Sequence, residues 1–342
     1  MSRFLHRASI LAARLSSSPH ATILCFHGVE ANGPAASGSA HVSTRHFRET
    51  IDVARSVARP VPLVELIDRW RAGHSTRGLF AVTFDDAYRS LADQAARDAL
   101  AGGMVPITIF VVNEATERGL PFWWDRVEAL HRVASRDQWL EFERAVGVPD
   151  SYRTSAALAY GPLRPMRQWV LERFAGRWPE SAAELLSASE ARFSVSAPQR
   201  AMTFPELESL VACGGVDIGV HTMSHPVLPQ LDDDEVRREV GMSYSQLRER
   251  WASTLPWLAV PFGLYDDRTA RLARDVGVEG ILSLNAFSLV HASFSHGLPR
   301  VNIMENAPPW KVALRLSGFA ERIWNPPRSG IPFPRRAQAD DR

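Results

Sequence analysis

Short apolar segments alternate with helical segments about six or seven times along this chain. Residues 79–84 and 106–112 show the pattern most clearly, because each is a nearly continuous run of apolar, β-favouring side chains. Such runs are typical of strands that are buried on both faces of a sheet. Repeated strand–helix units connect parallel strands, so we expect either a barrel or a doubly wound sheet.

The alternation stops at residues 114–199, where strand signals vanish. Helical patterns replace them, at about residues 123–134, 137–146 and 165–177. We interpret this region as a helical insertion that decorates one large domain, and not as a separate domain.

The large domain is predicted to cover residues 20–324. Residues 1–19 form a separate N-terminal segment, which we expect to be helical. Residues 325–342 contain two adjacent prolines and a run of charges, which is typical of a disordered tail.

Composition favours a soluble globular protein, since 45% of the residues are apolar and 23% are charged. A net charge of +1 gives no reason to expect a nucleic acid as the main partner. No stretch approaches the roughly 18–20 apolar residues that cross a bilayer. The apolar part of the N-terminus is short and is interrupted by Arg14, which argues against a signal peptide. We therefore expect a cytoplasmic protein without an integral membrane segment; the oligomeric state stays open.

The two cysteines, Cys25 and Cys213, both lie within apolar strand or helix patterns. This placement predicts buried, reduced thiols and not a disulfide framework.

Two adjacent carboxylates, Asp85 and Asp86, end the apolar run 79–84. Charges at the end of a buried strand cost solvation energy unless a partner compensates them, and a divalent cation is the simplest partner. Neighbouring strand residues point to opposite sides, so one aspartate can bind a metal while the other acts as a base. The alternative is that Asp86 caps a helix covering about residues 88–100.

Other polar residues also follow the carboxyl ends of apolar strands. They are His27, the pair His221 and His225, and the segment 261–263. In a parallel barrel these strand ends lie together on one face, where active sites are found. The candidate residues therefore favour a barrel-like arrangement over an open sheet.

The spacing of His221 and His225 brings two imidazoles within reach of one cation. A carboxylate would complete a set of two histidines and one aspartate, leaving positions for water and substrate. That set suits Zn²⁺, although Co²⁺, Ni²⁺ or Fe²⁺ fits the same donors. Alternatively, the histidines cap helices or form hydrogen bonds in the core.

Three motifs resemble those of the NodB-homology polysaccharide deacetylases, carbohydrate esterase family 4. Thr83-Phe84-Asp85-Asp86 is similar to the first motif of that family, His221-Thr222-Met223-Ser224-His225 to the second, and Val260-Pro261-Phe262-Gly263 to the third. Their order is that of the family, and the resemblance covers about residues 20–320 without the insertion. It implies a distorted (β/α)7-type barrel of parallel strands with the helical insertion added.

The same resemblance implies roles for these residues. Asp86, His221 and His225 would bind the metal, and Asp85 would be the catalytic base. Pro261, Phe262 and Gly263 would contact the substrate, with the backbone N–H of Phe262 stabilising the oxyanion.

The sequence departs from the family pattern in two places. Ala259 occupies the position of an arginine that orients the base. The histidine of the fifth motif, which supplies the general acid, is imitated by His291. A subgroup that resembles the exopolysaccharide deacetylases of biofilm matrices instead places this histidine after the first strand and lacks the arginine. Because residues 23–29 are similar to that version, we prefer His27 to His291 as the acid; a structural hydrogen bond is the alternative for His27.

The insertion offers an aromatic pair, Trp123 and Trp124, followed by Asp125. Aromatic faces stack on sugar rings and the carboxylate would accept bonds from hydroxyls, but aromatic residues at a helix start also serve as core.

The leading hypothesis is a metal-dependent hydrolase that removes the N-acetyl group of an amino sugar in a polysaccharide, oligosaccharide or glycan precursor. A second reading keeps the metal hydrolase but changes the substrate to a cyclic imide or another non-sugar amide. A third is a carbohydrate-binding protein with a dead site, because Ala259 replaces the expected arginine.

Overall fold

The computed structural model describes residues 21–31, 40–93, 97, 105–150, 152, 164–190, 195, 199–284 and 297–316. The predicted N-terminal segment 1–19 and the predicted tail 325–342 lie outside this part of the chain, as does His291.

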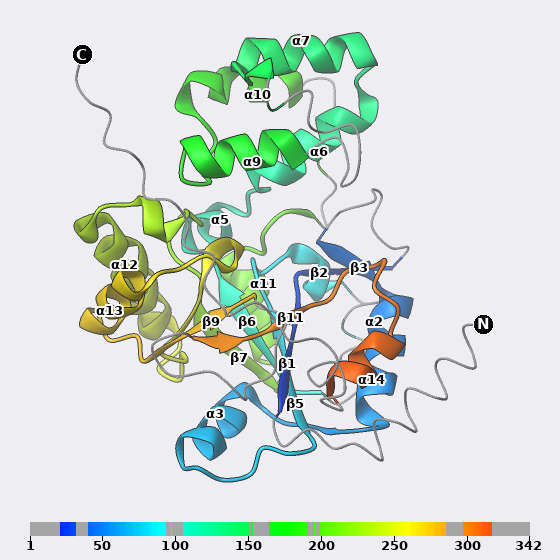
Figure 1. Cartoon of the computed structure of the whole chain (residues 1–342), viewed down its shortest axis with the longest axis vertical. Helices are drawn as coiled ribbons and strands as arrows, with labels where there is room; N and C mark the ends of the chain where they lie inside the picture. Colours follow the sequence, from blue (N-terminus) through cyan, green and yellow to red (C-terminus); the bar gives the residue numbers. More distant parts are fainter. Residues whose placement is uncertain are drawn as a thin grey trace.

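Parallel strands form one large sheet at the centre of the described chain (Figure 1). Their order across the sheet is β10-β9-β8-β7-β6-β5-β1-β11, with β4 beside β5. The strands are β1 (Thr22–Phe26), β4 (Arg59–Pro60), β5 (Leu79–Phe84), β6 (Ile107–Val111), β7 (Val216–Val220), β8 (Trp257–Ala259), β9 (Gly280–Ser283), β10 (Leu298–Pro299) and β11 (Val301–Asn302). Every residue of β1, β5 and β6 is buried, as their continuous apolar sequences predict.

One segment, residues 298–303, nearly closes this sheet into a barrel. β10 pairs with β9 and β11 pairs with β1, so the two ends of the strand order are separated along the chain only by Arg300. The N–H of Arg300 donates to the carbonyl of Ser283 at 2.9 Å, and the N–H of Ile303 donates to that of Cys25 at 2.9 Å. The predicted barrel of parallel strands is therefore confirmed.

Helices surround the strands (Figure 1). α12 and α13 pack against each other on one side, and α2 and α14 do so on another. The helices outside the inserted helical region are α2 (Thr44–Arg55), α3 (Leu63–Arg71), α11 (Phe204–Val211), α12 (Asp233–Arg250), α13 (Asp267–Asp275) and α14 (Trp310–Leu316). A small separate sheet joins β2 (Gly28–Glu30) to β3 (His41–Ser43).

The region between β6 and β7 is helical, as predicted, and several of its helices gather at one end of the molecule (Figure 1). Before α11, the helices of this region are α5 (Asn113–Arg118), α6 (Trp123–Val133), α7 (Arg136–Val146), α9 (Arg164–Arg173) and α10 (Ala183–Glu190), of which α6, α7, α9 and α10 form the group at that end. α6, α7, α9 and α10 share a core of their own, which includes Val127, Trp139, Phe142 and Trp169. This core explains why the region is rich in tryptophan.

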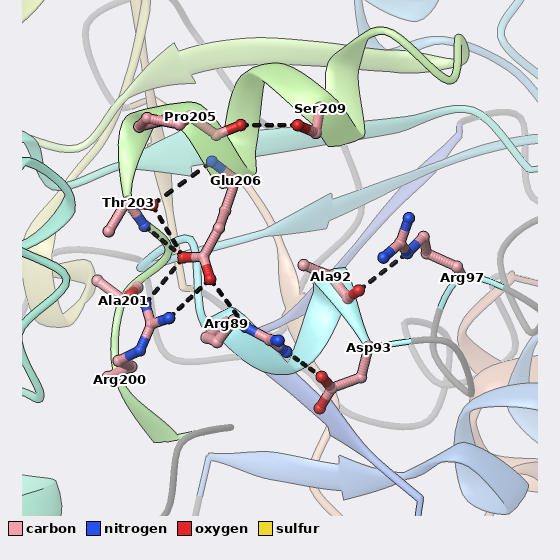
Figure 2. Close-up of polar contacts among 10 residues, drawn as sticks. All are labelled: Arg89, Ala92, Asp93, Arg97, Arg200, Ala201, Thr203, Pro205, Glu206 and Ser209. Atoms are coloured by element: carbon pink, nitrogen blue, oxygen red, sulfur yellow. Dashed lines mark hydrogen bonds and ion pairs between the residues drawn. The ribbon is translucent and has the colours of Figure 1, made fainter.

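The chain after this helical region is fastened to the turn that follows β5. The N–H of Met202 donates to the carbonyl of Ala87, and the N–H of Arg89 donates to that of Arg200, at 2.8 and 2.7 Å. Figure 2 shows Glu206 at the centre of the side-chain contacts there, accepting hydrogen bonds from Arg89 and Arg200.

The predicted helix over 88–100 is wrong at its start. Tyr88 has extended backbone and bridges to Ala201, and only a 3-10 turn over Arg89–Ala92 follows it. No side chain caps that turn, so Asp86 is not an N-cap. Residues 94–96 and 98–104 lie outside the described chain.

The burial predicted for Cys213 is also wrong. Cys25 is buried in β1, but Cys213 is exposed because it lies in the turn that follows α11, beside Gly214 and Gly215. Both thiols are free. None of the described helices is both long enough and apolar enough to span a bilayer.

Candidate active site

The backbone turns sharply where β5 ends, and this turn separates the two carboxylates. Asp86 and Ala87 have φ angles of 69° and 50°, in the left-handed region that few residues other than glycine adopt. Asp85 and Asp86 are both buried, at 1% and 3% exposure. The turn allows them to face different partners, as the sequence reasoning required.

Asp86 approaches both histidines of the second motif. Its Oδ1 lies 3.4 Å from Nε2 of His221 and 3.5 Å from Nε2 of His225. His221 follows β7, and the loop then curls back through Thr222 and His225, whose φ angles are 70° and 62°. Such strained backbone persists only where its surroundings hold it, and it clusters at functional sites.

A carboxylate shared between α12 and this loop supplies part of that support. Glu239 of α12 accepts hydrogen bonds from the N–H groups of Met223 and Ser224, at 3.0 and 2.9 Å, and from the Ser224 hydroxyl at 2.6 Å. Arg177 donates to the other side of Glu239 at 2.9 Å. These hydrogen bonds to α12 therefore hold the loop that carries both histidines in place.

The three side chains fit a divalent cation. Two atoms bound tetrahedrally to one zinc ion, each at about 2.0–2.1 Å, lie about 3.3 Å apart, close to the two separations from Asp86 Oδ1. That oxygen is buried and has no hydrogen-bond partner among the described residues. Nδ1 of His221 lies 2.7 Å from the carbonyl oxygen of Ala259, so it carries the proton and leaves Nε2 to face Asp86. Asp86, His221 and His225 thus form a possible metal site.

Charge in the cluster also suits a cation. Burial raises the pKa of Asp86, but the neighbouring imidazoles of His221 and His225 outweigh it and lower that pKa below its ordinary value. Burial lowers the pKa of His225 to about 3. For His221 burial acts in the same direction, but Asp85 and Asp86 outweigh it and raise its pKa. Asp86 and His225 therefore favour the forms that bind metal, a carboxylate and a neutral imidazole, whereas His221 must lose its proton to bind.

Asp85 faces a different partner, Arg300, which the sequence reasoning missed. Nη1 and Nη2 of Arg300 donate to Oδ1 and Oδ2 of Asp85 at 2.6 and 2.7 Å. Arg300 is fully buried. Burial alone would raise the pKa of Asp85, but the guanidinium and His221 hold that pKa well below its ordinary value.

Arg300 stands at the residue where the barrel closes, so its side chain enters the site from the segment between β10 and β11. Arg300 lies about 40 positions after Ala259, the position at which the family pattern has an arginine. The sequence does contain a sign of this contact, because Arg300 interrupts the otherwise apolar run Leu298–Val301. A charge in a buried strand segment requires a buried partner of opposite charge.

His27 lies beside these groups, at the end of β1. Atoms of Cys25, His27 and Asp85 lie within 4.8 Å of one another, and the Cys25 thiol donates to Asp85 at 3.5 Å. Burial lowers the pKa of His27. His27 is therefore in the site, whereas His291, the alternative acid, lies outside the described residues.

A cavity of about 190 Å³ brings these residues together with the helical region. Trp123, Trp124 and Phe262 line it, but Pro261 and Gly263 do not. Phe262 has a φ of 57°, and its ring lies 4.5 Å from that of His225. The lining residues are His27, Ala40, Asp85, Asp86, Trp123, Trp124, Asp125, Glu128, Arg167, Leu171, His221, His225, Phe262 and Leu284.

The two tryptophans line the cavity, and both also contact neighbouring residues of the protein. Trp124 stacks on Phe122 at 4.6 Å, and its indole N–H donates to the Tyr88 hydroxyl at 2.9 Å. The indole N–H of Trp123 donates to the carbonyl of Gly176 at 2.8 Å. Their contact with a sugar stays a prediction.

Comparison with known proteins relates part of the chain to a known family. The profile of the family described as polysaccharide deacetylase matches residues 175–281. Chitin deacetylase 1 of Cryptococcus neoformans var. grubii is 26% identical over 107 residues, which are 31% of this chain and 21% of that protein. This chain therefore matches only about a fifth of the length of that relative. Residues 175–281 are thus similar to the polysaccharide deacetylases.

Solved structures extend the likeness to most of the chain. IcaB from Ammonifex degensii has a TM-score of 0.54 at 18% identity, covering 87% of this chain and 98% of that one. The deacetylase PplD of Streptococcus pyogenes, solved in complex with acetate, has a TM-score of 0.53 at 16% identity, covering 87% and 99%. At such identities the likeness shows the fold.

These comparisons confirm the predicted resemblance to the polysaccharide deacetylases. The profile match contains His221, His225 and Phe262 but not Asp85 or Asp86. The first motif joins the other two through the fold, because β5 and β7 both end at this cavity.

Proposed function

We propose that this protein is a metal-dependent N-deacetylase, which hydrolyses the acetamide of an N-acetylated amino sugar in a polysaccharide, oligosaccharide or glycan precursor. The approach of Asp86 to His221 and His225, beside the Asp85–Arg300 pair in one cavity, carries the proposal. Zn²⁺ is the proposed metal, although Co²⁺, Ni²⁺ or Fe²⁺ would fit the same donors.

Asp86, His221 and His225 would hold the metal. A bound divalent cation polarises a carbonyl oxygen and lowers the pKa of water. The carbonyl of Ala259 fixes the orientation of the His221 ring, and Glu239 fixes the loop between the histidines. These contacts limit the reorganisation that metal binding requires.

Asp85 would act as the base that takes the proton from the attacking water. Its two oxygens accept from Arg300, so the guanidinium fixes the plane of the carboxylate and keeps it ionised. Arg300 is thus the proposed orienting residue, the role that the sequence left without a candidate at Ala259.

His27 would protonate the leaving nitrogen, because an amide anion is too poor a leaving group to depart alone. The backbone N–H of Phe262 would donate to the oxyanion of the tetrahedral intermediate. Trp123 and Trp124 would contact the sugar ring. Arg300 also weakens the alternative of a dead carbohydrate-binding site, which rested on the missing arginine.

The test measures the deacetylation activity of the protein after its metal has been removed and replaced by Zn²⁺. Tetra-N-acetylchitotetraose should release acetate and free amine in equal amounts. Asp85→Asn should bind metal but lose turnover. Release of product from a cyclic imide or a non-sugar amide, with none from the acetylated sugar, would replace this proposal by the second hydrolase reading.

A further inference from the structure

The wall of the cavity opposite the barrel carries charged groups that the proposed reaction does not use. Trp124 and Glu128 are four residues apart on α6, so they lie on one face of that helix. Arg167 reaches the same cavity from α9. All three belong to the helical region between β6 and β7.

Glu128 is the most informative of these residues. It is 5% exposed and lines the cavity. Its Oε2 accepts a hydrogen bond from Arg167 at 3.2 Å, but Oε1 has no partner among the described residues. Nε of Arg167 also lacks one. A buried carboxylate oxygen without a donor is costly, so its presence at a cavity indicates a ligand that supplies the donor.

Asp125 adds a second carboxyl group on the same wall. It is 6% exposed, and its Oδ2 accepts a hydrogen bond from the Tyr88 hydroxyl at 2.7 Å. Tyr88 follows Asp86 by two residues, so this contact ties the α6 wall to the proposed metal turn. Burial raises the pKa of Asp125 to about 7, which allows it to accept or donate near neutral pH.

We infer that Glu128 and Arg167 form a sugar-hydroxyl subsite, which binds the amino sugar whose acetamide is cleaved; this inference rests on the proposed function. A hydroxyl group donates to Glu128 Oε1 and accepts from the Arg167 guanidinium, so it satisfies both atoms that now lack partners. Two carboxyl groups beside one guanidinium disfavour an anionic ligand. Trp124 supplies an apolar face next to these polar groups, as sugar recognition requires.

The inference predicts that Glu128 sets affinity for the sugar and not the chemistry at the acetyl group. Glu128→Gln keeps the shape but loses the charge that strengthens the hydrogen bond. We expect KM for tetra-N-acetylchitotetraose to rise about tenfold, equivalent to about 1.4 kcal/mol. Hydrolysis of 4-nitrophenyl acetate, which has no sugar hydroxyl, should stay within about twofold of wild type.

Arg167→Met should raise KM for the tetramer in the same way. Two exposed residues of the helical region provide matched controls, Glu141→Gln on α7 and Arg132→Met on α6. Neither control variant should change kcat or KM for the tetramer or for 4-nitrophenyl acetate. Thermal unfolding of each variant shows whether the helical core has survived.

The outcomes separate this inference from the proposed function. An unchanged KM in Glu128→Gln, or an equal loss on the tetramer and the aryl ester, overturns the subsite while deacetylation stands. If the wild type binds the tetramer without hydrolysing it, the proposed function fails; a tenfold weaker Kd in Glu128→Gln then supports the subsite, and an equal Kd overturns it. Absence of binding by the wild type overturns both.

Discussion

Replacement of Arg300 by methionine removes the buried guanidinium that pairs with Asp85. Methionine fills part of the same volume but donates no hydrogen bond, so both Asp85 oxygens lose their closest partners, now at 2.6 and 2.7 Å. Asp85 stays buried, and within the described part of the chain the Cys25 thiol and the neighbouring histidines remain to compensate its charge.

The size of the effect follows from this geometry. Two charges about 4 Å apart attract each other by about 4 kcal/mol at an effective dielectric constant of about 20. Breaking a buried ion pair by removing one partner costs about 3–5 kcal/mol. In a chain of this size, that cost lowers Tm by roughly 4–7 °C. We also expect kcat/KM to fall about 100-fold, because the base loses both its orientation and its charge partner.

The pH profile separates a positioning role from a purely structural one. Arg300 favours the ionised form of Asp85, so its removal raises the pKa of that carboxyl group and moves the acid limb of kcat/KM to higher pH. Arg300→Lys keeps the charge and should shift the limb less. Exposed Arg132→Met is the control. A lower Tm with unchanged kcat/KM and an unmoved acid limb would refute the assignment of Arg300 to the base.

Three further predictions address other parts of the site. His27→Ala should lower amide hydrolysis at least 100-fold but spare 4-nitrophenyl acetate, because a phenolate leaves without a proton; equal losses on both substrates would remove His27 as the acid. Glu239→Gln should weaken Zn²⁺ binding about tenfold in a chelator competition, because the loop carrying both histidines loses its anchor; unchanged affinity would deny Glu239 that role. Hydrogen bonds from Arg200, followed by those from Thr203, lower the pKa of Glu206 to about 2. Its stabilisation is therefore fully present above about pH 5 and is lost as the pH falls towards 2. Glu206→Gln should cost about 1 kcal/mol in urea unfolding at pH 7 and progressively less at lower pH, whereas a constant difference would contradict this linkage.

The sequence allowed the buried strands, and the polar residues at their carboxyl ends, to be predicted. Continuous apolar runs mark β1, β5 and β6, and the polar residues that follow the strand ends meet because parallel strands end on one face. The sequence therefore predicted that Asp86, His221 and His225 would gather. It also placed α6, α7 and α9 of the region between β6 and β7 within a few residues, but it did not predict α5 or α10.

Contacts set by tertiary structure were not predictable in the same way. Arg300 reaches Asp85 only because residues 298–303 close the barrel, and no local pattern specifies that closure. Glu128 meets Arg167 because α6 and α9 pack together. The helix expected from Tyr88 onwards fails because Tyr88 pairs with Ala201, more than 100 residues away.

The most direct test of the account is the metal content of the purified chain after Zn²⁺ loading and dialysis, measured for wild type, His225→Ala and Asp85→Asn. We predict one ion per chain in the wild type and in Asp85→Asn, and loss of that ion in His225→Ala. Equal metal content in the wild type and His225→Ala, or loss of metal in Asp85→Asn alone, would contradict the proposed site.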